Sequence, residues 1–306
     1  MRQLVTTRNP AAALPRNIFA LSALLLASFF SSSAFAATFK IDAFEIGRCS
    51  TSGCDPTTNV FFADEFNAGG PPPNAPNFTS GNAATYFVNG SFPGGSEAGN
   101  KLTLNTANGI AGPNASGAIF NTISARLLSD TDPTQLNLGL KAGSTFSVFG
   151  LFDLPSTFQP NSGFDIRFFE RNSSSTVRQV QMRVGRDSGS PFVRFQVQDF
   201  LSGTLSQLGQ FDLDLAGTPD QIGLEMVYRP GTGVTGRFGY LSGGDLVGTP
   251  TSFTTPTPLF LLSSAVTAGF AASEAAVIPV PSAALLLMPG VLVLIGLARS
   301  NRKARS

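Results

Sequence analysis

The chain has 306 residues and a formal net charge of +1. It contains no histidine and no tryptophan, which excludes Ser-His-Asp triads, histidine-ligated metals and histidine general bases. Charged residues make up only 13% of the chain, whereas phenylalanine occurs 28 times and glycine 32 times. This composition favours many short strands joined by turns.

Residues 1–36 have the pattern of a secretory signal peptide. Basic residues through Arg16 precede the apolar run Ile18–Phe30, and the small residues Ala34 and Ala36 predict signal peptidase cleavage before Ala37. We therefore expect export through the Sec machinery. An uncleaved N-terminal anchor is the alternative, although the apolar run is short for a bilayer span.

Residues 37–276 form the body of the predicted protein, and its charge differs from that of the whole chain. Seven of the 20 lysines and arginines lie in the two terminal segments, which contain none of the 19 acids, so the body carries about −6. That sign disfavours binding to phosphate, and we expect no nucleic acid partner.

Residues 277–306 combine an apolar segment with a basic end. Ile278–Ala298 contains no ionisable side chain and, at 1.5 Å per residue, could cross a hydrocarbon core of about 30 Å. A helix buried in a soluble core is the alternative, but it would not need a basic cluster after it. That cluster predicts a cytoplasmic membrane stop and consists of Arg299, Arg302, Lys303 and Arg305.

The tail "IPVPSAALLLMPGVLVLIGLARSNRKAR" resembles the PEP-CTERM sorting signal of exopolysaccharide-producing Gram-negative bacteria. Pro279 and Pro281 match the two prolines of that family, and Val280 stands where its commonest form has glutamate. The resemblance implies recognition by an exosortase, a membrane-embedded transpeptidase that depends on cysteine, with cleavage near Pro279–Pro281. The proline pair would keep this backbone extended and outside the helix.

The body alternates apolar and polar residues with the period of strands and shows no sustained helical period. Phe164, Ile166 and Phe168 alternate with Asp165 and Arg167, which predicts one dry and one wet face. So many antiparallel strands require a second sheet over the apolar face. The sequence thus predicts an all-β domain of two antiparallel sheets, a sandwich or jelly roll, between a signal-peptide helix and a transmembrane helix. Strands are expected near residues 59–66, 84–92, 100–106, 145–154, 164–170, 180–184, 192–200, 211–215, 222–228 and 234–241.

The order of these segments resembles concanavalin A-like lectin/glucanase, or laminin G-like, jelly rolls. The resemblance is carried by "FADEFN", "GNKLTLNT", "STFSVFGLFDL" and "GTGVTGRFGYLSGG". It implies a jelly roll for most of the body.

The polar positions of three predicted strands form a candidate ligand face. If the strands are neighbours, this face would offer donors and amides to sugar hydroxyls or uronate carboxylates; an ordinary solvated face is the alternative. Tyr86, Tyr228 and Tyr240 could stack on sugars in place of tryptophan. The face consists of Arg167, Gln181, Arg183, Arg194, Gln196 and Gln198.

Cys49 and Cys54 predict a structural disulfide, because exported proteins oxidise cysteine pairs by default. A redox or metal role is the alternative, but no further ligands lie nearby in the sequence. We expect no metal site and no cofactor. A structural calcium ion held by aspartate and asparagine side chains is possible in this fold class, yet no D-x-D-x-D-G loop supports one.

Asp64 and Glu65 suggest a carboxylate pair for glycoside hydrolysis. Adjacent strand residues point to opposite faces, so these two cannot form that pair. The E-x-D-x-E pattern of glucanases with this fold is missing, and Asp212, Asp214 and Asp220 are interpreted as a wet strand face.

Together these features predict an exported, non-catalytic jelly-roll protein. We expect the C-terminal helix to tether it to the inner membrane until exosortase processing, after which it reaches the cell surface or the extracellular biofilm matrix and associates with exopolysaccharide. A polysaccharide-active enzyme with an unrecognised acid pair and a passive structural matrix protein are the alternatives.

Overall fold

The computed structural model describes residues 36–49, 54–67, 84–93, 96–129, 144–172, 175–213, 219–243, 245–254 and 266–276. The chain divides into two units, residues 1–35 and 36–306, and every described residue belongs to the second. The expected signal-peptide helix and C-terminal membrane helix therefore lie outside the described residues. Within the described ranges no helix has the length and apolar character needed to cross a membrane.

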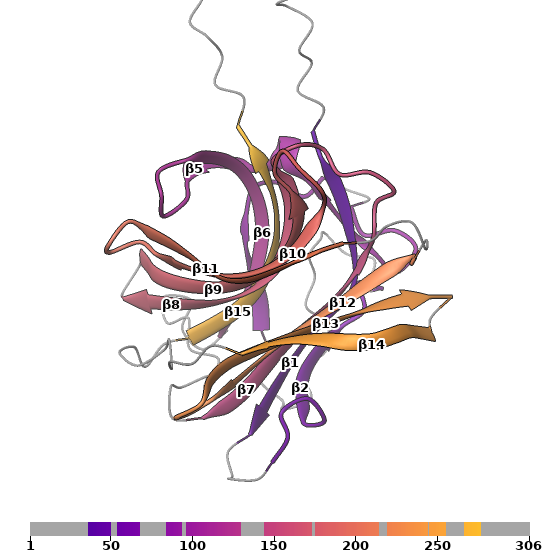
Figure 1. The fold of residues 1–306 in the computed structure, drawn as a ribbon, viewed down its shortest axis with the longest axis vertical. Helices are drawn as coiled ribbons and strands as arrows, with labels where there is room; N and C mark the ends of the chain where they lie inside the picture. Colours follow the sequence, from indigo (N-terminus) through magenta and orange to yellow (C-terminus); the bar gives the residue numbers. More distant parts are fainter. Residues whose placement is uncertain are drawn as a thin grey trace, which may run out of the picture. The chain divides into compact units, whose positions relative to one another are not determined.

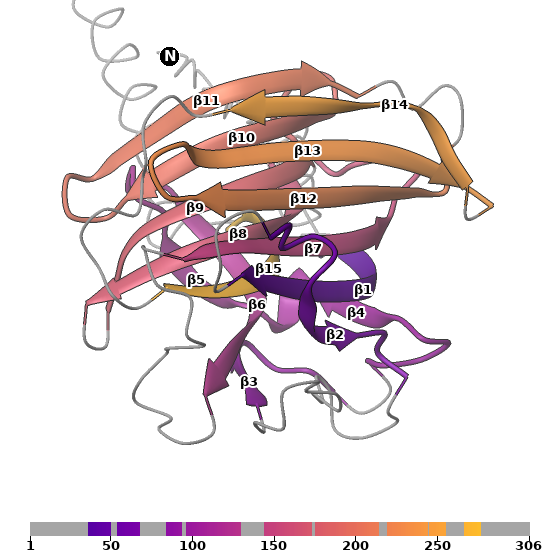
Figure 2. The same cartoon turned by 90° about the horizontal axis from the view of Figure 1, so that it is seen from below.

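The described residues form fifteen strands in two antiparallel sheets (Figures 1 and 2), which confirms the predicted all-β class. In the first sheet the order is β14-β13-β12-β7-β1-β2, and β4 pairs with the first half of β1. Its strands are β1 (Thr38–Cys49), β2 (Val60–Asp64), β4 (Leu102–Asn105), β7 (Thr145–Asp153), β12 (Gln221–Arg229), β13 (Gly233–Ser242) and β14 (Asp245–Thr254).

In the second sheet the order is β11-β10-β9-β8-β15-β6-β3, and β5 pairs with the first part of β6. A short 3₁₀ turn, η1 (Thr106–Asn108), follows β4. The strands are β3 (Ala84–Asn89), β5 (Ile110–Pro113), β6 (Ile119–Ser129), β8 (Ser162–Asn172), β9 (Ser175–Arg186), β10 (Phe192–Asp199), β11 (Thr204–Asp212) and β15 (Val266–Ala275).

The two sheets pack face to face through a core rich in phenylalanine. Phe152 of β7 stacks on Phe164 of β8 with ring centroids 4.4 Å apart, and Phe44 of β1 meets Phe270 of β15 edge to face at 5.0 Å. Burying each such ring stabilises the fold by about 1.5–3 kcal/mol. The alternation read from the sequence therefore orients β8, β9 and β10 with their apolar residues toward the first sheet.

The strands expected near residues 59–66, 84–92, 100–106 and 145–154 are present as β2, β3, β4 and β7, and those expected later are present as β8, β9, β10, β12 and β13. The strand expected at 211–215 is misplaced, because β11 runs from Thr204 to Asp212. Its residues are almost all exposed at a sheet edge, so burial imposes no strong alternation there.

Strands β1, β6 and β15 were not expected, although all three lie inside the sheets. The segment "VTAGFAASEA" of β15 is poor in residues with high strand propensity. Its first eight residues are buried, because β15 lies between β8 and β6 and is covered on both faces. A strand buried on both faces shows no alternation.

Candidate functional site

A groove of about 160 Å³ lies on the face of the second sheet that points away from the core. Strands β8, β9 and β10 form its floor. One wall comes from Gly112–Asn114 at the end of β5, and the other from Phe200 and Leu205 at the β10–β11 hairpin. Figure 1 shows β5 curving back over this face of the sheet.

All six residues of the predicted ligand face line this groove. The register explains why, since Arg183 pairs with Arg194 and Gln181 pairs with Gln196 across β9 and β10. Arg167 on β8 pairs with Gln181. Residues that are directly opposite on antiparallel neighbours share a face, so the alternation of three strands brings the six side chains together.

The expectation that this face is wet is wrong. Gln181 is 2% exposed, Gln196 4% and Arg183 8%. Side chains of the face cover one another, and the β5 wall is tied to the floor because the Ala115 amide donates to Oε1 of Gln198 at 3.1 Å. The groove is therefore a preorganised polar layer and not an ordinary solvated strand face.

Three of the four groove glutamines are joined by hydrogen bonds. Oε1 of Gln181 accepts from Nε2 of Gln179 at 2.9 Å and from Nε2 of Gln198 at 3.3 Å. Gln179 was not predicted as a site residue, although it continues the alternation of Gln181 and Arg183 along β9. The amide groups are thus held in fixed orientations before any ligand arrives.

Two of the three groove arginines have carboxylate partners. Arg167 forms a bidentate ion pair with the fully buried Asp165. Arg194 donates to Asp187 at 2.7 Å and to the side-chain oxygen of Gln210 at 2.9 Å, and its guanidinium lies 3.8 Å from the centroid of the Phe192 ring.

Arg183 lines the groove and differs from the other two arginines in its contacts. Its guanidinium donates to Oγ of Ser273 and lies 5.9 Å from the ring centroid of Phe120. Burial lowers the pKa of Arg183, an effect that Asp165 and Asp187 oppose and the other two arginines reinforce. Ser273 and Phe120 come from β15 and β6, strands that the sequence pattern did not predict, so no signal could have found them.

The three tyrosines proposed for sugar stacking lie elsewhere, which corrects that prediction. Tyr86 is buried and donates from its hydroxyl to Oδ2 of Asp64 at 2.9 Å. Tyr228 is 1% exposed and stacks on a core phenylalanine, and Tyr240 packs against Phe238. The apolar groups that do line the groove are Phe120, Phe200 and Leu205.

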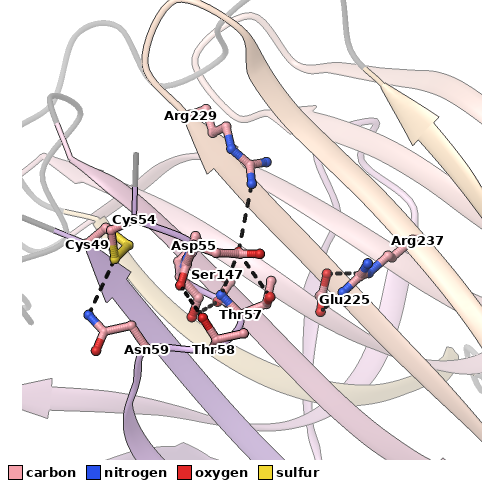
Figure 3. A network of polar contacts seen from close by, with 11 residues as sticks. Cys49, Cys54, Asp55, Thr57, Thr58, Asn59, Ser147, Glu225, Arg229 and Arg237 are labelled. Carbon is pink, nitrogen blue, oxygen red and sulfur yellow. Dashed lines mark hydrogen bonds and ion pairs between the residues drawn. A yellow bond between two sulfur atoms is a disulfide. The ribbon is translucent and has the colours of Figure 1, made fainter. Parts of the chain in front are cut away.

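A second pocket of about 220 Å³ lies on the outer face of the first sheet. Glu45, Phe149 and Glu225 are directly opposite one another on β1, β7 and β12. Burial is the main cause that raises the pKa of Glu45, and the charges of Glu65 and Glu225 raise it further. Glu225 is held by Arg237 at 2.6 Å (Figure 3). Sequence reasoning missed this pair because β1 was not predicted.

The structure places Cys49 and Cys54 in a disulfide with a Cα–Cα distance of 5.7 Å (Figure 3). The segment after it is fastened to β7, because Oγ of Ser147 donates to the Pro56 carbonyl at 3.2 Å. The same segment packs directly against β1 at Gly47. A Cβ on Gly47 would lie 1.7 Å from the Pro56 carbonyl oxygen, so this position has no room for a side chain. Within the described ranges no cluster of three or more histidine, cysteine, aspartate or glutamate residues could hold a metal ion.

The remaining acidic candidates do not converge. Asp64 is 1% exposed whereas Glu65 is exposed, which confirms that they point apart. The interpretation of Asp212, Asp214 and Asp220 as one strand face is wrong, because Asp212 ends β11 of the second sheet and Asp220 precedes β12 of the first. Asp214 lies outside the described residues.

The predicted processing sites lie mostly outside the described residues. Ala34, the motif Pro279, Val280 and Pro281, and the basic cluster from Arg299 to Arg305 are among the residues left undescribed. Ala36 and Ala37 are described, and Ala37 is buried immediately before β1 begins.

No protein-family model matches the chain, and no curated protein matches it. Among solved structures, the CBM2 module of the evolved Dit of Lactobacillus casei BL23 phage J-1 is similar with a TM-score of 0.39 and 11% identity, over 76% of this chain and 89% of that one. A Shewanella oneidensis MR-1 protein of unknown function is similar with a TM-score of 0.34 and 12% identity, over 88% of this chain and 89% of that one. Neither likeness is close enough to assign a function.

Proposed function

We propose that the chain is an exported, non-catalytic binding protein whose groove on the second sheet takes a segment of an extracellular polysaccharide. The observation that carries the proposal is the convergence of three arginines and four glutamines from three adjacent strands on one polar groove, in which all of them but Arg194 are buried. Amide and guanidinium groups held in fixed orientations suit the hydroxyl groups of sugars.

The size and walls of the groove support a single sugar unit of a longer chain as the ligand. Its volume of about 160 Å³ is below the ~300–1,000 Å³ of pockets that enclose drug-sized ligands. Phe200 and Leu205 offer apolar contact along one wall.

Binding without catalysis is favoured over hydrolysis at this site because both carboxylates of the groove are engaged by arginines. Asp165 pairs with Arg167, and Asp187 pairs with Arg194. Glycoside hydrolysis needs one carboxyl group to give a proton and another to act as base or nucleophile. A passive structural role in the matrix would need no preorganised polar layer.

The binding proposal is tested by a glycan panel and a groove variant. We expect one class of extracellular polysaccharide to bind the intact body, and we expect Gln181→Ala combined with Gln196→Ala to weaken that binding at least about tenfold, since two buried hydrogen-bonding groups are lost. Ser252→Ala, on the exposed surface of β14, is the matched control. Equal binding by both variants would rule the groove out as the binding site.

We further propose that the body is a concanavalin A-like jelly roll sorted as a PEP-CTERM substrate, with signal peptidase, Sec and exosortase as partners. What supports the sorting proposal is the resemblance of the tail, through Pro279, Pro281 and the basic end, to that family. In the described body the start of β1 and the end of β15 lie at the same end (Figure 1), so both proposed cleavages would take place on that side of the body. After processing, the body would reach the cell surface or the matrix.

The sorting proposal is tested by intact mass. In cells with an active exosortase we expect the mature protein to begin at Ala37 and to lack the basic cluster that starts at Arg299. Deletion of the exosortase should restore a membrane-bound form. An unshifted mass in both strains would contradict the assignment and leave a plain membrane anchor.

The alternative of a polysaccharide-active enzyme would use the second pocket. Burial raises the pKa of Glu45, as a general acid requires. The second carboxyl group of that pocket, Glu225, is ion-paired with Arg237. Release of reducing ends from the glycan panel, abolished by Glu45→Gln, would favour this alternative. We expect no release.

A further inference from the structure

Arg183 is a buried cation without a carboxylate partner among the described residues. Arg167 and Arg194 each form an ion pair. Within the described ranges, the side chain of Arg183 has one hydrogen bond, to the neutral hydroxyl of Ser273. At 8% exposure it has lost most of its water. A buried charge without a counter-charge costs free energy that a protein normally avoids.

The strand register adds to the free-energy cost of a charge at Arg183. Arg183 is directly opposite Arg194 on β10, and like charges at such positions repel. The opposite neighbour on β8 is Asp165, but that carboxylate is bidentate with Arg167. The groove therefore holds three arginines against two aspartates, both of which already have partners.

The backbone around Arg183 is shaped to admit its guanidinium. Gly163 and Gly185 are opposite each other on β8 and β9. A Cβ on either glycine would come within 3.2 or 3.3 Å of Nε of Arg183 and closer still to backbone atoms of the partner strand. Because Gly163 and Gly185 have no side chains, Nε of Arg183 can lie close to the backbone of β8 and β9. We call this space beside the two glycines the seat of Arg183.

We propose that this seat, flanked by Arg194 and Ser273, is a subsite for an oxyanion of the polysaccharide, either a uronate carboxylate or a sulfate ester. This inference rests on the proposed function and names the class of its ligand: an acidic polysaccharide. The oxyanion would supply the missing counter-charge for Arg183, and a guanidinium can bind either group with two parallel hydrogen bonds.

Arg183 should contribute nothing to the stability of the ligand-free protein. If the role of Arg183 is to bind a ligand, its removal should relieve a buried charge that has no ion-pair partner among the described residues. We expect Arg183→Met to leave the unfolding midpoint of the ligand-free protein unchanged or raised, because an apolar side chain of similar volume avoids the desolvation cost of a buried charge. An arginine retained for the fold would give a large loss of stability.

The binding experiment compares glycans that differ only in charge. Calorimetric titrations of the intact body would use oligomers of galacturonate, mannuronate and glucuronate, each beside its carboxyl-reduced counterpart, and dextran sulfate beside dextran. We expect at least one acidic member to bind about tenfold or more tightly than its neutral partner. Arg183→Gln should remove that difference, whereas the control Arg229→Gln, an exposed arginine of β12, should retain it.

The outcomes separate this inference from the proposed function. Preference for uronates assigns a carboxylate, and preference for dextran sulfate alone assigns a sulfate ester. If neutral and acidic members bind equally, and that binding is lost in the Gln181 and Gln196 double variant, then the oxyanion subsite is wrong but the groove binds polysaccharide. If no acidic member exceeds its neutral partner, or Arg183→Met unfolds the protein, the inference is overturned.

Discussion

The main-chain nitrogen of Ala37 lies 2.6 Å from Oε2 of Glu274, which is 237 residues later in the chain. The same carboxylate oxygen accepts from Oγ1 of Thr106 at 2.7 Å, and the amide of Thr106 donates to the Ala37 carbonyl at 3.0 Å. One carboxylate thus joins the first strand of the body to its last. If signal peptidase cleaves before Ala37, the nitrogen of Ala37 becomes a charged α-amino group, whose ordinary pKa is about 8.

Glu274→Gln should therefore destabilise the mature protein by about 1–3 kcal/mol, because a hydrogen bond to a charged partner is lost. The cost should be larger in protein that begins at Ala37 than in protein that retains a residue before it. Urea denaturation of both forms measures this, with the exposed Glu65→Gln as the control. Equal costs in the two forms would show that the contact does not depend on processing.

Asp64 should make stability depend on pH. Burial raises the pKa of Asp64 to about 6; the hydrogen bonds from the Phe66 amide and the Tyr86 hydroxyl lower it, and the charges of Glu97 and Glu65 raise it. In the unfolded chain the value is about 3.9. Because the folded value is the higher one, the stability contributed by the protonated group is full below about pH 4 and is lost as pH rises through about 6.

The side chain introduced by Asp64→Asn cannot ionise. The free energy of unfolding of the wild type minus that of the variant should therefore fall by about 2 kcal/mol between pH 4 and pH 7. Urea midpoints at four pH values across this window measure the difference. Asp212→Asn, at an exposed position, is the control. Parallel pH curves for wild type and Asp64→Asn would contradict the prediction.

Gly163→Ala should disturb the seat of Arg183. The new Cβ would lie 2.3 Å from the carbonyl oxygen of Val184, so β8 and β9 must separate locally, and we expect a loss of about 1–3 kcal/mol together with weaker glycan binding. Gly189→Ala is the matched control, because a Cβ there meets no atom within 4 Å. Thermal unfolding and titration of both variants test this, and similar behaviour of the two would argue against a shaped seat.

Replacing both Cys49 and Cys54 with serine should cost about 2 kcal/mol, the loop entropy of so short a disulfide loop. We expect the oxidised wild type, but not the variant, to lose this amount of stability on reduction. Chemical denaturation with and without reductant measures the effect. Identical stabilities would mean that the contact between Ser147 and the Pro56 carbonyl holds the segment without the disulfide.

Much of the fold and of the groove could be read from local pattern. Alternation in β8, β9 and β10 marked which side chains share a face, because side chains of an antiparallel strand alternate between its two faces. Gln181, Arg183 and Gln196 were therefore identified without tertiary information. The same pattern could not reveal their burial, which depends on neighbours brought from other strands, such as Ser273, 90 residues after Arg183.

The sequence by itself determined the all-β class, the opposite orientation of Asp64 and Glu65, and the residues of the polar face, since each follows from the two-residue period of a strand. Only the tertiary structure decided that β15 and β6 belong to the second sheet and that the end of β5 lines one side of the groove. It also decided that Arg183 is a buried cation without a carboxylate partner in the described part of the chain. The reason is physical. Strands covered on both faces lose their alternation, and the environment of a charge is set by residues that are distant in sequence and adjacent only after folding.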